Sequence, residues 1–254
     1  MTDKFLARLL DQATEPYRAA GRFGYHFSRG KLSSDCIFRE LLRRGVFPKE
    51  ARFLDLGCGQ AVFASWLLAA RALYDKGDWP ADWPEPPRVL ELRGFELMEK
   101  DVARGRAALA AHEPRVAIRQ GDICKTDFGQ ADVVSILDVL HYIDYAGQED
   151  VLRRVRAALP PGGLLVTRVG DADGGLPFHV CNWVDRAVTF VRGHRLPTLY
   201  CRRLTEWLEL LRGLGFEVDT MPMSEGKPFA NVMLIARVPG FSEAKTTGVN
   251  PSST

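Results

Sequence analysis

The chain has few cysteines and few histidines, and neither type is clustered. Its 254 residues include five of each, and no Cys-x-x-Cys pair occurs. Metal sites built from these residues need ligands at short, regular spacings, so no metal site is predicted. The odd number of cysteines and their wide scatter predict reduced thiols instead of a disulfide framework. A catalytic cysteine is an alternative, although no partner base is in view.

Long charged runs and long apolar runs are also missing. Lysine and arginine number 34 against 32 aspartate and glutamate, which gives a formal charge of +2. No basic tail indicates nucleic acid, and no stretch reaches the roughly 18 apolar residues of a membrane span. The first eight residues carry charges where a signal peptide has its apolar core. We therefore predict a cytoplasmic protein with no nucleic-acid partner and no membrane span.

Residues 52–61, Arg-Phe-Leu-Asp-Leu-Gly-Cys-Gly-Gln-Ala, predict a strand, a tight turn and a helix. Apolar residues lead up to Gly57 and Gly59, which break the strand, and an apolar helical run starts at Ala61. Glycine lets a backbone turn sharply against a ligand, and the helix behind the turn offers unpaired N–H groups to a carboxylate or phosphate. This stretch predicts a site for a small polar cofactor, with a ligand-free turn as the alternative.

Two common nucleotide motifs do not fit this stretch. A dinucleotide fingerprint needs glycine or alanine at the sixth position counted from Gly57, where this chain has the branched Val62. A nucleotide-binding P-loop needs Gly-Lys-Ser/Thr after the turn, and that sequence is absent. The motif therefore argues against a dehydrogenase and against a P-loop nucleotide-binding protein.

Strands alternate with helices along the rest of the chain. The pattern predicts helices over 61–74, 99–111, 147–159 and 204–212, and strands over 52–56, 93–97, 115–119, 132–137, 164–169, 213–218 and 231–236. Such alternation predicts an α/β protein, a Rossmann-like doubly wound seven-stranded sheet with helices on both faces. Ligands of such sheets bind at the carboxyl ends of the strands.

An N-terminal helical arm, 1–50, precedes this domain, which we place at 51–239. Within the arm we expect a polar-aromatic loop over 21–30 and a second helix from about Ser34 to Arg44, started by serine and aspartate capping. The arm can close over the cofactor from outside the sheet. We place Tyr25 and His26 there, with an ordinary surface loop as the alternative.

Three further segments depart from the regular pattern. The insertion 75–88 holds four prolines and two tryptophans, and prolines at this density forbid regular structure. We expect the tryptophans to pin the insertion to its own domain, and a binding site for a partner is the alternative. Residues 170–202, rich in aromatics and arginine, are too long for a plain loop and predict a lid over the acceptor, with a helix near 178–191; a helix that merely packs is the alternative. Residues 240–254 predict a disordered tail.

Five motifs occur in order between residues 52 and 169: Leu-Asp-Leu-Gly-Cys-Gly, Gly-Phe-Glu-Leu, Gln-Gly-Asp-Ile, Leu-Asp-Val-Leu-His-Tyr-Ile-Asp and Leu-Pro-Pro-Gly-Gly. Together they resemble the class I S-adenosylmethionine-dependent methyltransferases of the small-molecule type. The resemblance implies an antiparallel last strand between the fifth and the sixth. It also implies S-adenosyl-L-methionine as the cofactor and S-adenosyl-L-homocysteine as the product.

The resemblance assigns parts of the cofactor to matching residues. It places Asp55, Gly57, Cys58 and Gly59 at the amino-acid end, Glu96 at the ribose, Asp122 and the amide of Ile123 at the adenine, and Asp138, Val139 and Leu140 at the methyl side. The pattern alone also favours Glu96, because an acid at the end of the strand beside the glycine turn can accept both ribose hydroxyls. A helix-capping role is the alternative, but Glu96 stands two residues early for it.

The predicted activity is transfer of a methyl group to a small-molecule acceptor. O- or C-methylation of an aromatic or polyketide-like metabolite of secondary metabolism is favoured, with the acceptor free or presented on an acidic carrier protein. A general base is needed only for a phenol or alcohol, and histidine is the usual choice. His141 and His179 are the candidates for catalysis, and His26 and His194 stay open.

Other functions remain as alternatives. Methylation of amines in nucleic acid usually comes with Asn/Asp-Pro-Pro-aromatic after the fourth strand, where this chain reads Leu-Asp-Val-Leu. The Pro-Cys of cytosine-C5 enzymes is absent from the same place. A cofactor-binding module without catalysis and a methyltransferase acting on a carrier- or macromolecule-bound substrate both stay open.

Overall fold

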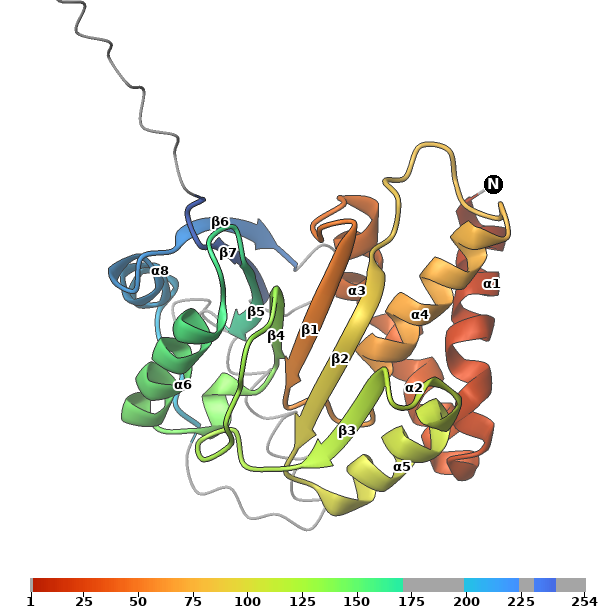
Figure 1. Ribbon diagram of the computed structural model, residues 1–254, viewed down its shortest axis with the longest axis horizontal. Coiled ribbons are helices and arrows are strands. Elements are labelled where there is room, and N and C mark those ends of the chain that lie inside the picture. The colour runs from red at the N-terminus through yellow and green to blue at the C-terminus, as the bar shows by residue number, and fades with distance from the viewer. Residues whose placement is uncertain (1, 171–198, 224–230, 241–254) are drawn as a thin grey trace, which may run out of the picture.

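A computed structural model describes residues 2–170, 199–223 and 231–240 of the protein. Seven strands in these ranges form one sheet, in the order β3-β2-β1-β4-β5-β7-β6 (Figure 1). Their bounds are β1 Glu50–Leu56, β2 Arg88–Glu96, β3 Val116–Gln120, β4 Val133–Leu137, β5 Leu164–Gly170, β6 Glu217–Pro222 and β7 Asn231–Arg237. The seven-stranded sheet predicted from the sequence is confirmed.

The strand order places a switch point beside the glycine turn. Strands β1 to β5 are parallel, and β2 and β4 flank β1 on its two sides. The chain builds outward from β1 to β3, then returns and builds in the other direction from β4. Strand β7 is antiparallel to both β5 and β6 and lies between them, as the resemblance implied. The connections that leave the carboxyl ends of β1 and β4 lead to opposite sides of the sheet, and doubly wound sheets bind ligands at such a point.

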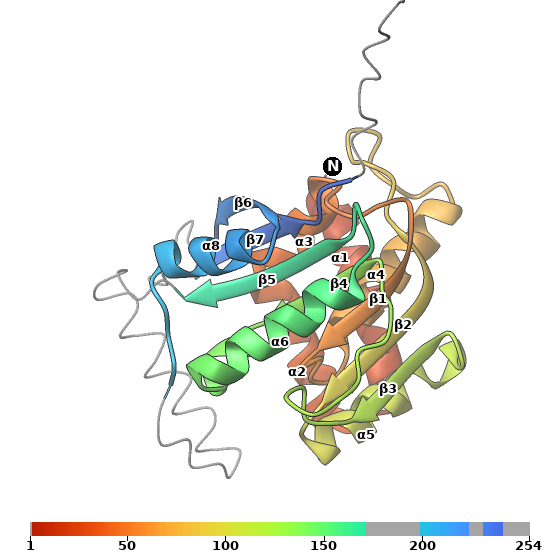
Figure 2. The same ribbon diagram turned by 60° about the vertical axis from the view of Figure 1, so that its left-hand side comes forward.

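Helices cover both faces of the sheet (Figures 1 and 2). Helices α4 (Val62–Asp75) and α5 (Glu99–Leu109) lie on one face, and α6 (Tyr145–Ala158) and α8 (Leu204–Gly213) lie on the other. Side chains alternate between two cores, so Phe53 packs in the first and its neighbour Leu54 in the second. This near-continuous apolar strand is typical of a parallel sheet buried on both sides.

The N-terminal arm differs from the prediction at residues 21–30. The structure has α1 (Thr2–Thr14), a 3₁₀ turn (Glu15–Arg18), α2 (Gly21–Ser34) and α3 (Cys36–Arg43). The expected loop was wrong, because α2 runs straight through it. Gly24, Ser28 and Leu32, four residues apart, are buried on one face of α2. Such packing of one helix face outweighs the low helix propensity of its glycines.

The second predicted arm helix is confirmed as α3. Asp35 caps it, since its carboxylate accepts a hydrogen bond from the backbone N–H of Ile37 (3.2 Å). Aspartate is among the preferred residues at this position because it satisfies an otherwise unpaired N–H group.

The arm shares the hydrophobic core of the sheet face that carries α4. Leu9 and Tyr17 are fully buried in this core. Two hydrogen bonds tie the arm to α4: the Ser65 hydroxyl donates to the carbonyl of Ala13 (2.6 Å), and the Trp66 indole donates to that of Phe38 (2.9 Å). The predicted boundary at residue 50 therefore does not separate two cores, and the division into arm and domain stays a prediction.

The tryptophans of the insertion 75–88 pin it to the protein's own fold, and the ring that both of them contact belongs to the arm. The rings of Trp79 and Trp83 lie 5.2 and 5.6 Å from that of Phe5 on α1, both in edge-on geometry. Edge-on contacts of this kind add to the gain from burying the rings. Strand β2 begins at the last residue of the insertion, five residues earlier than predicted, because Arg88 already pairs with Glu50 of β1.

Two predicted segments fall largely outside the described residues. These are the lid, with its helix near 178–191, and the tail, apart from residue 240. The four remaining predicted helices are confirmed within a few residues of their expected ends.

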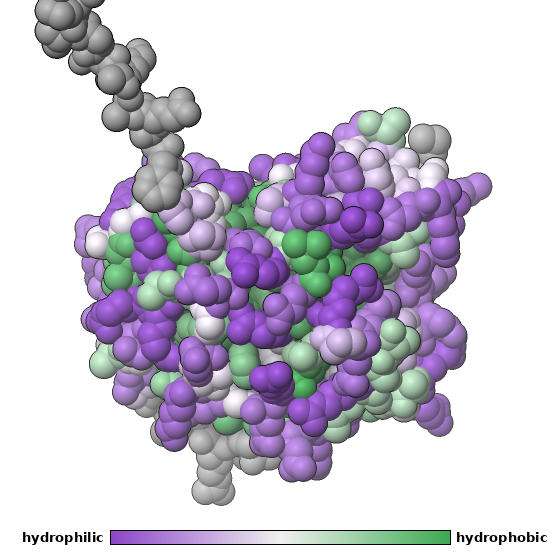
Figure 3. Space-filling view, viewed as in Figure 1, coloured by the Kyte–Doolittle hydropathy of each residue, from purple (hydrophilic) through white to green (hydrophobic). Residues whose placement is uncertain are grey.

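The surface carries mixed polar and apolar side chains. On the face seen in Figure 3, small apolar groups are separated by hydrophilic ones, as is ordinary for a folded protein. Among the helices that the structure describes, none combines the length and the apolar character that a membrane crossing requires.

Replacing Trp83 with alanine should lower the free energy of unfolding by about 3 kcal/mol, because it removes a buried ring from the contact with α1. Urea denaturation followed by circular dichroism measures this change. Asp82→Ala in the same insertion is the control, since Asp82 is exposed. Equal stability of the two variants would show that the insertion is not anchored through Trp83.

Candidate cofactor and acceptor site

The turn after β1 is shaped by two glycines in left-handed conformations. The N–H groups of Gly57 and Cys58 both donate to the carbonyl of Phe95 on β2 (2.8 and 3.0 Å). Gly57 has a φ of +74°, and a Cβ there would lie 2.3 Å from a methyl group of Val139, so no side chain fits. At Gly59, with φ +55°, a Cβ would meet nothing within 4 Å. The turn is therefore closed toward Val139 and open beside Gly59.

Glu96 lies across this turn from the end of β2. One of its carboxylate oxygens accepts from the N–H of Gly59 (2.9 Å), and the other accepts from the N–H of Met98 (2.9 Å). Met98 is the N-cap residue of α5, so Glu96 stands two residues before the capping position, as predicted, and bonds only the N–H of the N-cap residue itself. Each oxygen keeps a second lone pair. The half-buried carboxylate can still accept two hydroxyl groups from a ligand.

Asp55 lies beneath the turn and is almost fully buried, with 3% of its surface exposed. Burial raises its pKa to about 7, and the charge of Glu96 acts in the same direction. The Ser135 hydroxyl donates to its carboxylate (2.6 Å), which lowers the pKa and so partly opposes the burial. A cation placed nearby would favour the ionised form of Asp55.

Cys58 is packed inside the turn. Its sulfur lies close to β2, since a Cβ on Gly94 would come within 2.8 Å of it. Burial, followed by the charges of Asp55 and Glu96, raises the pKa of this thiol well above its ordinary value. A protonated, enclosed thiol is a poor nucleophile, which argues against Cys58 as a catalytic cysteine.

Asp122 and Ile123 follow β3 at the same edge of the sheet. One oxygen of Asp122 accepts from the N–H of Cys124 (2.9 Å), and the other lies 3.6 Å from the ammonium of Lys125. The Ile123 carbonyl accepts from the guanidinium of Arg154 (2.7 Å), which fixes the turn. Glu96 pairs with the last residue of β3, so this turn lies beside Glu96.

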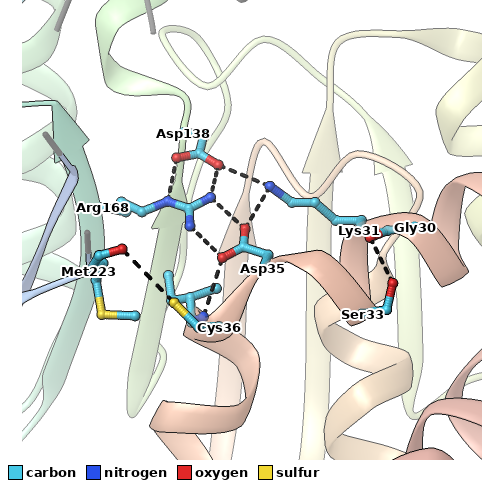
Figure 4. Close-up of polar contacts among 9 residues, drawn as sticks. Gly30, Lys31, Ser33, Asp35, Cys36, Asp138, Arg168 and Met223 are labelled. Carbon is cyan, nitrogen blue, oxygen red and sulfur yellow. Dashed lines mark hydrogen bonds and ion pairs between the residues drawn. The ribbon is translucent and has the colours of Figure 1, made fainter. Parts of the chain in front are cut away.

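Asp138, directly after β4, belongs to a cluster of four charges (Figure 4). The guanidinium of Arg168 on β5 bonds both oxygens of Asp138 and both oxygens of Asp35. The ammonium of Lys31 lies 2.9 Å from Asp35 and 3.2 Å from Asp138. We call these four residues the charge quartet. Lys31 and Asp35 come from the arm, so the quartet joins the arm to the end of the sheet.

The opposite charges of the quartet stabilise the ionised forms of Asp138 and Lys31. Burial opposes ionisation of Asp138, but Arg168 and Lys31 outweigh it and bring the pKa of Asp138 well below its usual value. Burial likewise opposes the charge of Lys31, yet Asp138 and Asp35 keep its pKa above the ordinary range. Neither Asp138 nor Lys31 can therefore take a proton from an acceptor at neutral pH.

The loop that follows Asp138 is held on its other side by Gln148. This fully buried side chain donates to the carbonyls of Leu140, Ile143 and Tyr200 (3.1, 3.2 and 2.8 Å) and accepts from Arg202 (2.8 Å). These bonds also bring the segment before α8 against the loop.

The structure describes two of the four histidines named as candidate bases. His141 lies in this loop, its ring 4.1 Å from that of Tyr142, and its carbonyl accepts from the N–H of Tyr200 (2.9 Å). His26 is on α2, with its ring 5.4 Å from that of Tyr25. His179 and His194 lie outside the described residues. Within the described ranges, no three histidine, cysteine, aspartate or glutamate side chains gather in a way that could hold a metal ion.

The predicted cofactor residues come together at one edge of the sheet. They lie in the last residues of β1 and β2 or in the turns after β1, β3 and β4, and these four strands are adjacent in the order β3-β2-β1-β4. Sequence reasoning missed Lys31, Asp35 and Arg168. Arg168 carried a signal, because it is the one charged residue in the apolar strand Leu-Leu-Val-Thr-Arg-Val. A charge inside such a strand indicates a buried partner.

Comparison with known proteins agrees with this geometry. Residues 54–165, from β1 to the start of β5, match the family model of a methyltransferase domain. A carboxy-S-adenosyl-L-methionine synthase of Chromohalobacter salexigens is 35% identical over 118 residues, which are 46% of this chain and 38% of that protein. The chain thus spans well under half the length of this curated relative.

Two solved structures illustrate the shared fold. An O-methyltransferase family protein from Burkholderia thailandensis is 19% identical, with a TM-score of 0.58 over 89% of this chain and 63% of the other. The magnesium protoporphyrin IX methyltransferase of Synechocystis PCC 6803, with bound S-adenosylhomocysteine, is 16% identical, with a TM-score of 0.56 over 92% and 99%.

The sheet and its helices define a Rossmann-like doubly wound protein with an antiparallel last strand. The match over residues 54–165, less than half of the chain, supports a methyltransferase domain of the class I S-adenosylmethionine-dependent family, as the motifs indicated. S-adenosylmethionine is the cofactor of this family. The residues present fit it, because the turn leaves open space beside Gly59 and the Glu96 carboxylate, which bonds the N–H of Gly59, keeps lone pairs for further donors.

The raised pKa of Asp55 predicts a pH-dependent component of stability. The native state keeps the Asp55 proton up to pH about 7, whereas an unfolded aspartate releases it near pH 3.9. Between these values the native state binds more protons, so this component of the free energy of unfolding falls as pH rises. The Asp55→Asn side chain cannot ionise, so this variant should lack the pH-dependent component of the free energy of unfolding.

Melting temperatures of both proteins between pH 5 and pH 8 measure this effect. We expect the difference to move in favour of the asparagine variant as pH rises. Parallel profiles would show that Asp55 is ionised throughout in the native protein.

Proposed function

We propose that the protein transfers the methyl group of S-adenosyl-L-methionine to a small-molecule acceptor. The observation that carries the proposal is the Glu96 carboxylate bound to the glycine turn, with one oxygen 2.9 Å from the backbone N of Gly59. A ribose beside Gly59 would bring two vicinal hydroxyls to a charged acceptor, which binds them more strongly than a neutral group would.

The remaining cofactor contacts are proposed from their places around Glu96. Asp55, with Gly57 to Gly59, would hold the amino-acid end. An ammonium beside Asp55 would lower its raised pKa and so favour the ionised carboxylate. Asp122 and Ile123, beyond Glu96 at the end of β3, would hold the adenine. Asp138, Val139 and Leu140, on the opposite side of the turn, would line the methyl group.

When bound, the cofactor supplies a methyl group on a cationic sulfur, whose departure needs no proton. The chain's own residues bind, orient and exclude water, and orientation of this kind contributes several kcal/mol to catalysis. For a hydroxyl acceptor, a base is also required. We propose His141 or His179 for this role, since the pKa values of Asp138 and Lys31 are shifted away from it.

We propose an aromatic or polyketide-like acceptor of secondary metabolism, methylated on oxygen or carbon in the cytoplasm. It could be free or presented on a carrier protein. Support comes from the aromatic composition of residues 170–202 and from the similar solved structure of a magnesium protoporphyrin IX methyltransferase.

A second candidate function follows from the curated relative. The 35% identity to a carboxy-S-adenosyl-L-methionine synthase favours a reaction in which S-adenosylmethionine itself is modified. Incubation with methyl-labelled cofactor and mass spectrometry separates the two. The incubation contains a phenol as methyl acceptor and, in a parallel arm, a carboxylic acid as carboxyl donor. Label in the phenol supports methyl transfer, a cofactor carboxylated at the expense of the added acid supports synthesis, and unchanged cofactor with tight binding indicates a binding module.

Calorimetry of the purified protein tests the proposed cofactor directly. We expect S-adenosylhomocysteine to bind with a dissociation constant of micromolar order, about −8 kcal/mol. NAD should give no heat, because Val62 crowds the position that a dinucleotide turn leaves to glycine or alanine. A folded sample without heat from S-adenosylhomocysteine would contradict the proposal.

Glu96→Ala should weaken binding of S-adenosylhomocysteine about thirty- to hundredfold, since a charged acceptor of two hydroxyls is worth ~2–3 kcal/mol. Glu99→Ala is a matched control, because Glu99 is exposed three residues further on. Asp122→Ala should have a smaller effect, because its expected partner is an uncharged amine. Affinity within threefold of the unmodified protein for Glu96→Ala would remove Glu96 from the ribose.

A further inference from the structure

The charge quartet has no counterpart among the proposed cofactor contacts, apart from Asp138. Its other members are Lys31 and Asp35 on the arm and Arg168 on β5. The quartet therefore spans three parts of the fold that are far apart in sequence, which is visible in Figure 4.

The inner half of the quartet is buried. The side chains of Arg168 and Asp35 are 7% and 11% exposed, against 33% for Lys31 and 36% for Asp138. Arg168 meets Asp35 with two bonds of 2.7 and 2.8 Å, one to each carboxylate oxygen. Paired charges at such depth are a weak source of stability, but removing one partner is costly because the others stay buried. The geometry of the four groups is therefore mutually enforced.

The quartet reaches the cofactor turn through one residue. Asp138 adopts a left-handed backbone with φ of +60°, which is uncommon for a residue with a side chain. Such a conformation persists only where surrounding contacts enforce it, and Arg168 with Lys31 supplies them. Val139 comes next, and its methyl groups fill the space beside Gly57, where a Cβ would meet them at 2.3 Å.

We propose that Asp35 is a positioning residue for the cofactor site, acting through Arg168 on Asp138 and so on the placement of Val139 against the glycine turn. The inference rests on the proposed function and adds the arm to it. Asp35 itself bonds α3, Lys31 and Arg168, not the turn. The arm thus takes part in cofactor binding through charge, at a distance from the cofactor.

The test compares Asp35→Asn with Asp11→Asn by calorimetry with S-adenosylhomocysteine. Asparagine caps helices about as well as aspartate, so α3 keeps its start. Loss of the charged partner of Arg168 should weaken binding about 5- to 20-fold. Asp11 forms an exposed ion pair with Arg29 inside the arm and does not reach the sheet, so its variant should bind within twofold of the unmodified protein.

Melting temperature and binding stoichiometry separate positioning from general stability. A merely structural role of Asp35 would lower the melting temperature or the active fraction and leave the dissociation constant of the folded molecules unchanged. Arg168→Lys keeps the charge but cannot bond both carboxylates with two bonds each, and it should weaken binding in the same direction. It also serves as the measurement if Asp35→Asn does not fold.

The outcomes for this inference and for the proposed function are distinct. Unchanged dissociation constants for Asp35→Asn and Arg168→Lys, beside a weakened Glu96→Ala, would overturn the positioning role and leave the cofactor site intact. No binding by the unmodified protein would overturn both.

Discussion

The backbone at Gly57 lies so close to Val139 that no side chain fits between them, and the site is built around this contact. It joins the loop after β4 to the turn after β1. From these two adjacent strands the chain continues to opposite sides of the sheet, which makes this the switch point. Because one side of the turn is closed, the open side beside Gly59 is the place left for a ligand. Glu96, at the end of β2, accepts a hydrogen bond from the N–H of Gly59 and so reaches the turn directly.

Two polar networks keep the loop after β4 in place. The charge quartet fixes Asp138 from the arm and from β5, whereas Gln148 fixes Leu140 and Ile143 from α6. Both networks are buried in part, where an unpaired polar group is costly, so each favours one geometry over its alternatives. Val139 stands between them and receives its position from both.

Local signals in the sequence were sufficient for the strands, the turn and the place of Glu96 at the end of β2. Apolar runs, glycines and the acid at the end of β2 each act within a few residues, so they can be read without the fold. The place of β7 came from the family resemblance, since no local pattern sets strand order. Helix α2 was missed because packing of its buried face decides it, and the quartet was missed because residues 31, 35, 138 and 168 meet only in the folded chain.

The central claim is that Glu96 and the glycine turn hold the cofactor of a methyltransferase. A crystal structure of the protein with S-adenosylhomocysteine tests it most directly. The account predicts both ribose hydroxyls within hydrogen-bond distance of the Glu96 carboxylate, beside Gly59, with Val139 still against Gly57. A ribose bound elsewhere, with Glu96 touching only the N–H groups of Gly59 and Met98, would contradict it.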